Sequence, residues 1–378
     1  MPPWEPGGLN QPATRKRLAV ASIKRYKKSR GYGWRVQYRA PDGTSRTKQG
    51  FRTKDEAQTW AAANTIDQAT GSWIDPTAGK VTVNALGGRW LASLTHLKPS
   101  TMNLTERTWR VHVQPAWGHR QIASIKPSEV QAWIGEIPGS GTTVRRAHAC
   151  LAQILDTAVM DDMIKANPAR GVKLPKKNRA RKVFLTADQL ATLAGECSRH
   201  GELVFLLGTV GLRWGEAVAL RVEDIDFLRG RALIHRNAVW VGSELHVGTP
   251  KTHEQRSVAI PRFVLEMLSR VCAGKARSDY LWVNRQGLPL RPPHHSDWYG
   301  CALERVMAAD PDFPRVTVHG LRHVAAGLMV SAGANVKVVQ RQLGHSSAAM
   351  TLDTYADLFD GDLDEVALAL DASLRGVV

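Results

Sequence analysis

Hydrophobic and polar residues alternate with a period of two in three short stretches that follow residue 20. The stretches are Ser22–Tyr26, Gly33–Tyr38 and Ser45–Phe51. This alternation predicts three β-strands, and Pro41-Asp-Gly43 predicts a turn between the last two. Thr53 is a helix N-cap residue, so a helix is expected from about Lys54 to Thr70, where Gly71 ends it. The pattern predicts a small domain of three strands and one helix over residues 21–75.

Apolar residues recur at helical spacing between residues 80 and 168. Four helices are predicted there, over Val83–Leu94, Pro99–Val111, Pro127–Ile134 and Thr142–Met160. The fourth has a continuous apolar stripe, formed by Ala147, Leu151, Ile154, Leu155 and Ala158. Pro168 ends this helical region. An all-helical domain is therefore expected over residues 80–170.

The rest of the chain mixes both patterns. Thr186 caps a helical stretch that is expected to reach Leu207, and a turn and a further helix follow at Arg213. Three strands of one small antiparallel sheet are expected next, at Ala232–Val241, Glu244–Val247 and Arg256–Ile260. The remainder is expected to be helical. Residues 185–378 are thus predicted to be a mainly helical domain, and the whole chain a multidomain α+β protein.

The net charge of the chain indicates the kind of partner that it binds. The chain of 378 residues has a formal net charge of +17 and a pI near 10.0, which indicates a polyanion. The excess lies in the first half: residues 1–80 have a net charge of +9, residues 81–182 of +10 and residues 183–378 of −2. Bulk charge therefore does not account for the arginines in the motifs of the second half.

Two basic segments are predicted to be irregular. Residues 1–20 are expected to form a flexible basic tail. Residues 171–184 are expected to form a basic linker, which is either a solvated tether or a segment that follows DNA phosphates. Its cations include Lys176, Lys177, Arg179 and Arg181.

The four cysteines show neither close pairing nor metal-ligand spacing, which is typical of a reduced cytosolic protein. No stretch approaches 18 apolar residues and the first residues lack the apolar core of a signal peptide, so no membrane association is expected.

Three short motifs and one tyrosine carry the candidate chemistry. The motifs are Thr209-Val-Gly-Leu-Arg213-Trp-Gly-Glu216, His319-Gly-Leu-Arg322-His323 and Leu343-Gly-His345-Ser-Ser, and Tyr355 follows the last of them by ten residues. Two guanidinium groups can neutralise the oxygens of one phosphate, and two histidines can donate hydrogen bonds to it. A phenol can attack phosphorus, and a lysine such as Lys251 can protonate the leaving oxygen. No phosphate-binding loop or carboxylate cluster suggests ATP or a metal ion, so no cofactor is expected.

These motifs resemble those of the tyrosine recombinases, and the phage-type integrases in particular. The resemblance implies a site-specific DNA recombinase that cleaves each strand through Tyr355, forms a 3′-phosphotyrosyl intermediate and exchanges strands through a four-way junction. It implies catalytic roles for Arg213, Lys251, His319, Arg322 and His345. His319 is also a candidate acceptor of the tyrosine proton, whereas Glu216 and His323 are expected to be supporting residues.

The resemblance also implies DNA contacts in each domain. Residues 80–170 correspond to a core-binding domain, and residues 21–75 to an arm-type DNA-binding domain, although a merely solvated sheet face is the alternative. The candidate contacts of that sheet are Lys24, Arg35, Arg39, Arg46 and Lys48. Double-stranded attachment-site DNA, a homo-tetramer and accessory DNA-bending and excision factors are the implied partners.

Two rival functions and one packing question stay open at this point. A type IB topoisomerase would share the chemistry, and a non-catalytic DNA-binding regulator would share the DNA contacts. After Tyr355 the chain turns acidic and then presents one apolar helical face, with Leu363, Val366, Ala367, Leu370 and Leu374. This segment is expected to pack either on its own domain or on a neighbouring protomer.

Overall fold

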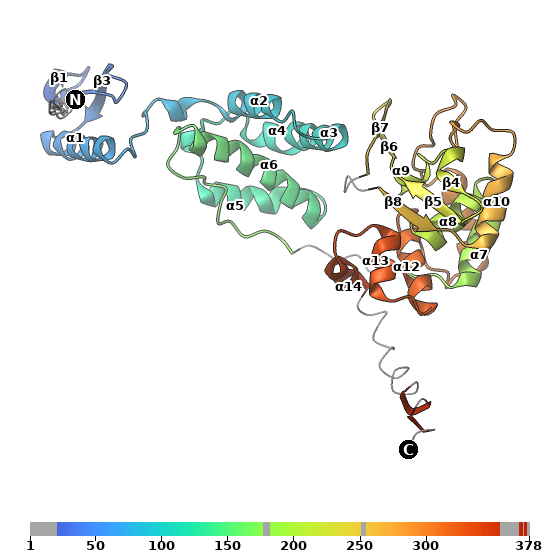
Figure 1. Ribbon diagram of the computed structural model, residues 1–378. Coiled ribbons are helices and arrows are strands. Elements are labelled where there is room, and N and C mark those ends of the chain that lie inside the picture. The colour runs from blue at the N-terminus through green and yellow to red at the C-terminus, as the bar shows by residue number, and fades with distance from the viewer. Residues whose placement is uncertain (1–20, 177–181, 251–254, 356–369, 373, 376–378) are drawn as a thin grey trace, which may run out of the picture. The chain divides into compact units, whose positions relative to one another are not determined.

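The computed structural model describes residues 21–176, 182–250, 255–355, 370–372 and 374–375. The predicted flexible tail and most of the acidic C-terminal segment lie outside these residues. The chain divides into two compact units, Met1–Leu97 with Leu104–Asn178 and Lys98–Asn103 with Arg179–Val378. Figure 1 labels the elements of both.

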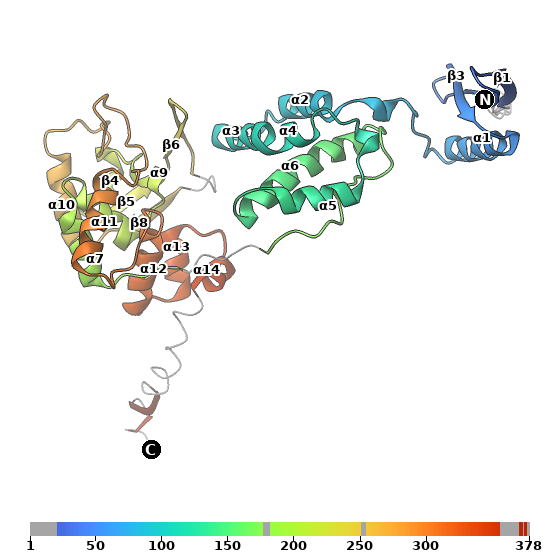
Figure 2. The same cartoon turned by 180° about the vertical axis from the view of Figure 1, so that it is seen from behind.

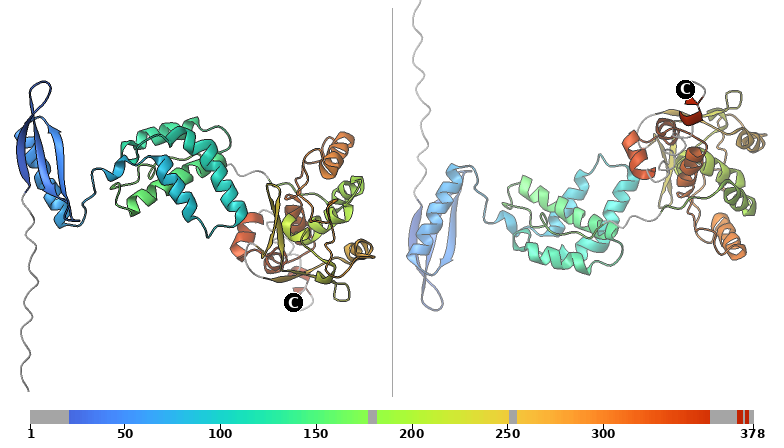
Figure 3. Two further views of the ribbon diagram at one scale, coloured as in Figure 1. Left: turned by 90° about the horizontal axis from the view of Figure 1, so that it is seen from above. Right: turned by 90° about the horizontal axis from the view of Figure 1, so that it is seen from below.

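The first elements are a three-stranded antiparallel sheet and one helix. Strands β1 (Ser22–Lys27), β2 (Tyr32–Arg39) and β3 (Ser45–Phe51) lie in the order β1-β2-β3. Helix α1 (Lys54–Ala69) begins at Thr53, whose side chain accepts a hydrogen bond from the backbone N–H of Glu56. The helix covers one face of the sheet (Figure 3), where Val36 packs against Ala57. Strands and helix therefore form where the alternation and the cap predicted them.

A helical region follows, as the 3.6-residue pattern predicted. It contains α2 (Val83–Ser93), α3 (Pro99–Thr108), α4 (Gln114–Trp117), α5 (Pro127–Glu136) and α6 (Gly141–Met160). Its core is rich in indole rings, for Trp90, Trp109, Trp117 and Trp133 are all buried. Gly87 allows the Trp109 ring to lie close to α2, because a Cβ atom at this position would lie 2.6 Å from that ring.

The predicted helix to Val111 does not continue as a regular α-helix. Residues Trp109–Val113 form a π-helical turn, and α4 begins immediately after it. Pro115 has no backbone N–H to donate to an i−4 carbonyl, which favours a change of helical register at this point.

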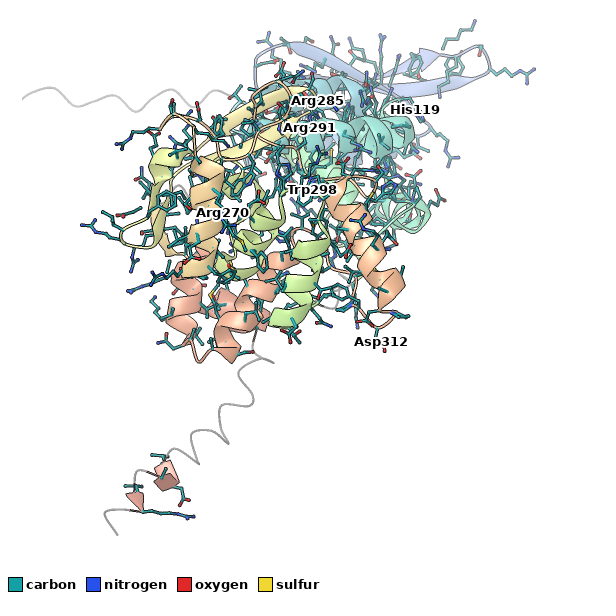
Figure 4. The ribbon with its side chains drawn as sticks, turned by 90° about the vertical axis from the view of Figure 1, so that its right-hand side faces the viewer. His119, Arg270, Arg285, Arg291, Trp298 and Asp312 are labelled. Atoms are coloured by element: carbon teal, nitrogen blue, oxygen red, sulfur yellow. The ribbon has the colours of Figure 1, made fainter. Side chains whose placement is uncertain are left out.

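The second unit opens with two helices where one helical stretch was predicted. Helix α7 (Ala187–Glu196) ends before α8 (Gly201–Val210), because His200 lies between them in the left-handed conformation, with φ of 63°. The His200 ring packs edge to face against Trp298, which is labelled in Figure 4, with centroids 5.3 Å apart. No local sequence pattern predicts this contact, because His200 and Trp298 lie far apart in the chain.

The strands of this unit also differ from the prediction of one three-stranded sheet. Strands β4 (Ile225–Asp226), β5 (Arg231–Ile234) and β8 (Arg256–Ala259) form one sheet, and β6 (Asn237–Val241) and β7 (Glu244–Gly248) form a separate hairpin. The predicted strand Ala232–Val241 breaks at His235 and Arg236 because both side chains turn to the buried carboxylate of Asp224, at 2.8 Å and 2.6 Å. The hairpin is held by Arg291 (Figure 4), whose guanidinium lies 4.1 Å from the centre of the Trp240 ring.

The remaining helices of this unit follow α8 in the chain. They are α9 (Trp214–Ala217), α10 (Arg262–Cys272), α11 (Trp298–Ala309), α12 (Leu321–Ser331), α13 (Val336–Leu343) and α14 (Ala348–Tyr355). Helix α12 packs on α8. Helix α13 packs on α12, and α14 packs on α13 (Figure 2). The predicted α+β fold is confirmed, and none of its described helices is long and apolar enough to cross a membrane.

Candidate active site

Five of the six predicted catalytic residues lie among the described residues, and the structure brings them together. Arg213 follows α8, His319 lies just before α12, and Arg322 lies in the first turn of α12. His345 follows α13 and Tyr355 ends α14. The sixth, Lys251, lies outside the described residues, between β7 and β8.

The turn around Gly211 positions the two arginines. Gly211 has a φ of +74°, which favours glycine, and a Cβ atom there would lie 2.4 Å from the side chain of Leu343. The backbone carbonyl of Gly211 accepts a hydrogen bond from Nη1 of Arg322 at 2.7 Å. Arg213 follows two residues later, and its Nη2 donates to the carbonyl of Gly344 at 3.4 Å. The glycine turn therefore ties α8, α12 and the end of α13 around one point.

Glu216, a predicted supporting residue, is hydrogen-bonded to Arg213. Its carboxylate accepts from the backbone N–H of Arg213 at 3.0 Å and from Nη1 of the same residue at 2.8 Å. It also accepts two hydrogen bonds from Arg256, at 3.2 Å and 2.7 Å. Burial alone raises the pKa of Glu216, but Arg256 and Arg213 outweigh it and hold the pKa below its usual range. A buried, charged carboxylate thus bridges two guanidinium groups.

Arg256 is a residue that the motifs did not single out. It lies on β8, and only 12% of its side chain is exposed. Its guanidinium also lies against Gly344, where a Cβ atom would come within 2.7 Å of Nε. Gly344 ends α13 with a φ of +69°. The sequence around Arg256 does not predict its contact with Glu216, because the two residues are 40 positions apart in the chain.

Arg322 supplies a buried donor that has no hydrogen-bond partner in the described part of the chain. The residue is 4% exposed, and its Nη2 makes no hydrogen bond to any residue that the structure describes. Burial and then Arg213 lower the pKa of Arg322 to about 10, so the group stays charged near neutral pH. An unpaired buried guanidinium donor is costly in free energy, and an anion bound there would satisfy it. The arrangement fits a phosphate group.

The histidines of the site are held in different ways. Nδ1 of His345 lies 2.8 Å from Oγ1 of Thr351, which is fully buried. The His319 ring packs edge to face against His323, with centroids 5.8 Å apart. Burial lowers the pKa of all three histidines. Arg322 and Arg213 lower the pKa of His319 and His345 further, and His319 and Lys182 lower that of His323, to about 4 for His323 and His345. All three are therefore neutral at pH 7.

Tyr355 is a buried phenol at the edge of this cluster. It is 1% exposed, and its hydroxyl lies 2.9 Å from Nδ1 of His323. Burial raises the pKa of Tyr355 to about 12, although Arg322 opposes the rise. Lys182 lies 5.5 Å from the centre of its ring. The phenol is thus protonated at neutral pH and needs a group that takes its proton during an attack.

The five candidate DNA-contacting side chains of the N-terminal sheet lie on its two different faces. Pairing sets Lys24 opposite Arg35, and Arg39 lies on the same face as Arg35, away from α1. These three side chains are exposed. Arg46 and Lys48 pair with Tyr38 and Val36 and so belong to the other face. Three of the five candidates therefore share one open surface.

Arg46 already has partners inside its own domain. Its guanidinium bonds to Asp75, pairs with Asp42 at 3.5 Å and lies 5.7 Å from the centre of the Trp73 ring. Of the linker cations, Lys176 is exposed, whereas the other three, Lys177, Arg179 and Arg181, lie outside the described residues.

Comparison with known proteins finds matches over most of the chain. The profile of the Phage integrase family matches residues 183–361, and that of the Phage integrase central domain matches residues 83–174. The integrase of Mycobacterium phage D29 is 27% identical over 320 residues, which is 80% of this chain and 84% of that protein.

Two solved structures share the fold. The Tn1549 transposon integrase in complex with a circular intermediate DNA has a TM-score of 0.65 at 23% identity and covers 72% of this chain and 94% of its own. A lambda integrase tetramer bound to a Holliday junction has a TM-score of 0.55 at 19% identity and covers 88% and 97%.

Together with these matches, the arginines and histidines beside a buried tyrosine define a DNA strand transferase of the tyrosine type. The chain belongs to the phage integrase family of tyrosine recombinases. The resemblance stated from the motifs is confirmed, and with it the enzyme class.

Proposed function

We propose that this chain cleaves and rejoins DNA strands at a specific site, through a covalent 3′-phosphotyrosyl bond to Tyr355. The observation that carries the proposal is the convergence of Arg213, Arg322, His319 and His345 on one region with the Tyr355 phenol beside it. The unpartnered Nη2 of Arg322 supplies a donor for a nonbridging oxygen. Such preorganised donors stabilise the charge that builds up on phosphorus in the transition state.

Each residue has a task in this reaction. Arg213 and Arg322 neutralise the scissile phosphate, and their fork geometry suits two oxygens at once. His319 and His345 are additional donors to the phosphate. Lys251 is proposed to protonate the leaving 5′-oxygen. The phosphotyrosyl bond conserves the energy of the phosphodiester, so a free 5′-hydroxyl can reverse the step without ATP.

The test is to replace Tyr355 with phenylalanine. The ring stays, so folding and DNA affinity should be retained, while the attacking oxygen is lost. Duplexes tiled across the DNA that flanks the gene serve as substrates, each with a nick that traps the cleaved strand. The wild-type chain should form an SDS-resistant adduct with one of them and Tyr355→Phe should form none. An adduct with the variant would show that another residue is the nucleophile.

The domains are proposed to divide the DNA contacts. Residues 80–170 and the catalytic domain hold the core site, the linker 171–184 follows phosphates between them, and residues 21–75 bind outlying arm sites. Lys24, Arg35 and Arg39 share the open face of the sheet, which suits entry into a major groove.

A matched pair of variants tests that division. Replacing Lys24, Arg35 and Arg39 together with alanine should strongly weaken arm-site binding, reduce its salt dependence and leave core cleavage unchanged. Lys48→Ala, on the opposite face, should change arm binding much less. Equal effects of the two variants on a footprinted long flanking duplex would contradict the assignment of the open face.

The active assembly is proposed to be a homo-tetramer on DNA, with accessory DNA-bending and excision factors setting direction. The lambda integrase that shares this fold forms a tetramer on a Holliday junction. Neither a type IB topoisomerase nor a non-catalytic regulator has support among the relatives. Sedimentation of the chain on a synthetic four-way junction that contains the core site tests the stoichiometry.

A further inference from the structure

The hydroxyl of the nucleophile has one protein partner among the residues that the structure describes. Oη of Tyr355 lies 2.9 Å from Nδ1 of His323, 32 residues earlier in the chain. The two rings meet at 63° with centroids 5.7 Å apart. A bond of this length between a 1% exposed phenol and an imidazole fixes the direction of the phenol oxygen.

The other two histidines of the site do not occupy this position. The His319 ring contacts His323 edge to face, at 5.8 Å between centroids, so His323 lies next to both it and the tyrosine. Nδ1 of His345 is engaged by Thr351, and its ring lies nearly parallel to that of Tyr355 at 6.2 Å. Among the described residues no hydrogen bond joins His319 to the hydroxyl of Tyr355, whereas His323 is already in contact with it.

Helix α12 connects this contact to the phosphate site. Arg322 and His323 are consecutive residues, and consecutive side chains on an α-helix point about 100° apart. Arg322 is directed to Gly211 and carries the unpartnered donor, while His323 is directed to Tyr355. One rigid helix therefore sets the phosphate-binding cation and the phenol oxygen relative to each other.

We propose that Nδ1 of His323 is the general base of strand cleavage and the general acid of rejoining. This inference rests on the proposed function. As the bond from Oη of Tyr355 to phosphorus forms and the bond from phosphorus to O5′ breaks, the phenolic proton passes to Nδ1. The leaving O5′ takes its proton from the general acid, proposed above to be Lys251. Rejoining returns both protons, so the cycle balances without any further reactant.

The groups around His323 keep it able to accept a proton. It faces His319, Arg322 and Lys182, and burial together with these groups lowers its pKa to about 4. The ring is therefore neutral at pH 7, with Nδ1 as acceptor when Nε2 carries the hydrogen. The negative charge of a bound phosphodiester stabilises the imidazolium that proton transfer creates. Proton transfer is thereby coupled to the presence of DNA.

The hydrogen bond can be tested without DNA. The full chain labelled with ¹⁵N-histidine gives nitrogen resonances that report tautomer and hydrogen bonding, and His323→Asn identifies those of His323. Tyr355→Phe removes only the hydroxyl, so it should shift Nδ1 of His323 and leave its Nε2 protonated. Unchanged His323 resonances in Tyr355→Phe would overturn the inference.

The role in catalysis is tested by single-turnover adduct formation on the flanking duplex that the wild-type chain cleaves. His323→Phe removes the acceptor, and His323→Asn keeps an acceptor near the position of Nδ1 but cannot take up a proton. Both should slow adduct formation by about 10²–10⁴-fold, the range for a lost general base, with DNA affinity unchanged. In the wild-type chain the rate should fall as the pH is lowered towards about 4, where His323 becomes protonated, and His323→Asn should lose this dependence.

The outcomes separate the two proposals. If wild type forms an adduct and His323→Asn does so within tenfold of its rate, His323 only positions the phenol and the general-base inference is wrong. If His323→Phe matches wild type, the contact has no role in cleavage at all. If wild type forms no adduct with any flanking duplex, the proposed function itself fails.

Discussion

Replacing Glu216 with glutamine is the sharpest test of the electrostatic framework. The change keeps the size of the side chain and removes its charge, at a residue whose side chain is fully buried between Arg213 and Arg256. Both guanidinium groups would then lose the only carboxylate that they contact among the described residues. The free energy of unfolding of the catalytic unit should fall.

The magnitude follows from the hydrogen bonds. Oε1 of Glu216 accepts from Nη1 of Arg213 and Nη1 of Arg256, and Oε2 accepts from the backbone N–H of Arg213 and Nη2 of Arg256. A glutamine has one oxygen, so in either orientation two donors face an N–H₂ group instead of an acceptor. At about 1.5–3 kcal/mol for each bond to a charged group, and given the cost of an uncompensated buried charge, we expect a loss of about 3–5 kcal/mol.

The assay is urea unfolding of the full chain, read by pulsed hydrogen exchange in peptides from α8 and α12 so that the catalytic unit is observed by itself. Glu304→Gln is the matched control, because Glu304 pairs with Arg315 and more than half of each side chain is exposed. Such a surface pair contributes about 0–1 kcal/mol. If Glu216→Gln costs no more than Glu304→Gln, the buried bridge does not hold the site together.

Three further predictions follow from the same site. Lys251→Ala should regain most of its cleavage rate on a 5′-bridging phosphorothiolate, because a thiolate leaves without a proton. Arg322→Ala should stay impaired on the same substrate. Equal rescue of the two variants in single-turnover assays would show that Lys251 is not the general acid. Burial lowers the pKa of His323 and of His345 to about 4. The unfolded chain should therefore bind more protons than the folded one between about pH 6.5 and pH 4. Urea midpoints of the catalytic unit should fall as the pH falls through that window. Gly344→Ala should lower adduct formation about tenfold or more and destabilise the unit, because the new Cβ atom meets a guanidinium group at a φ of +69°; a wild-type rate would contradict the packing at the end of α13.

Much of the fold could be predicted because its elements are decided by local pattern. The alternation at Ser22–Tyr26 and the cap at Thr53 each act within a few residues, and the strand and helix appear there. The prediction of a strand or helix was wrong where a residue outside that segment determines the local structure. The strand Ala232–Val241 breaks because Asp224 attracts two of its side chains, and the helix after Thr186 breaks at His200.

The sequence by itself determined the family and the residue types of the site, because Arg213, Arg322 and Tyr355 stand in short motifs whose spacing is specific. Only the tertiary structure decided which groups touch. Arg256 reaches Glu216 from a strand 40 residues away, and His323 reaches Tyr355 from 32 residues away. Such contacts depend on how α12, α14 and β8 pack against one another, and the periodicity of one segment does not contain the distance between two side chains on different elements.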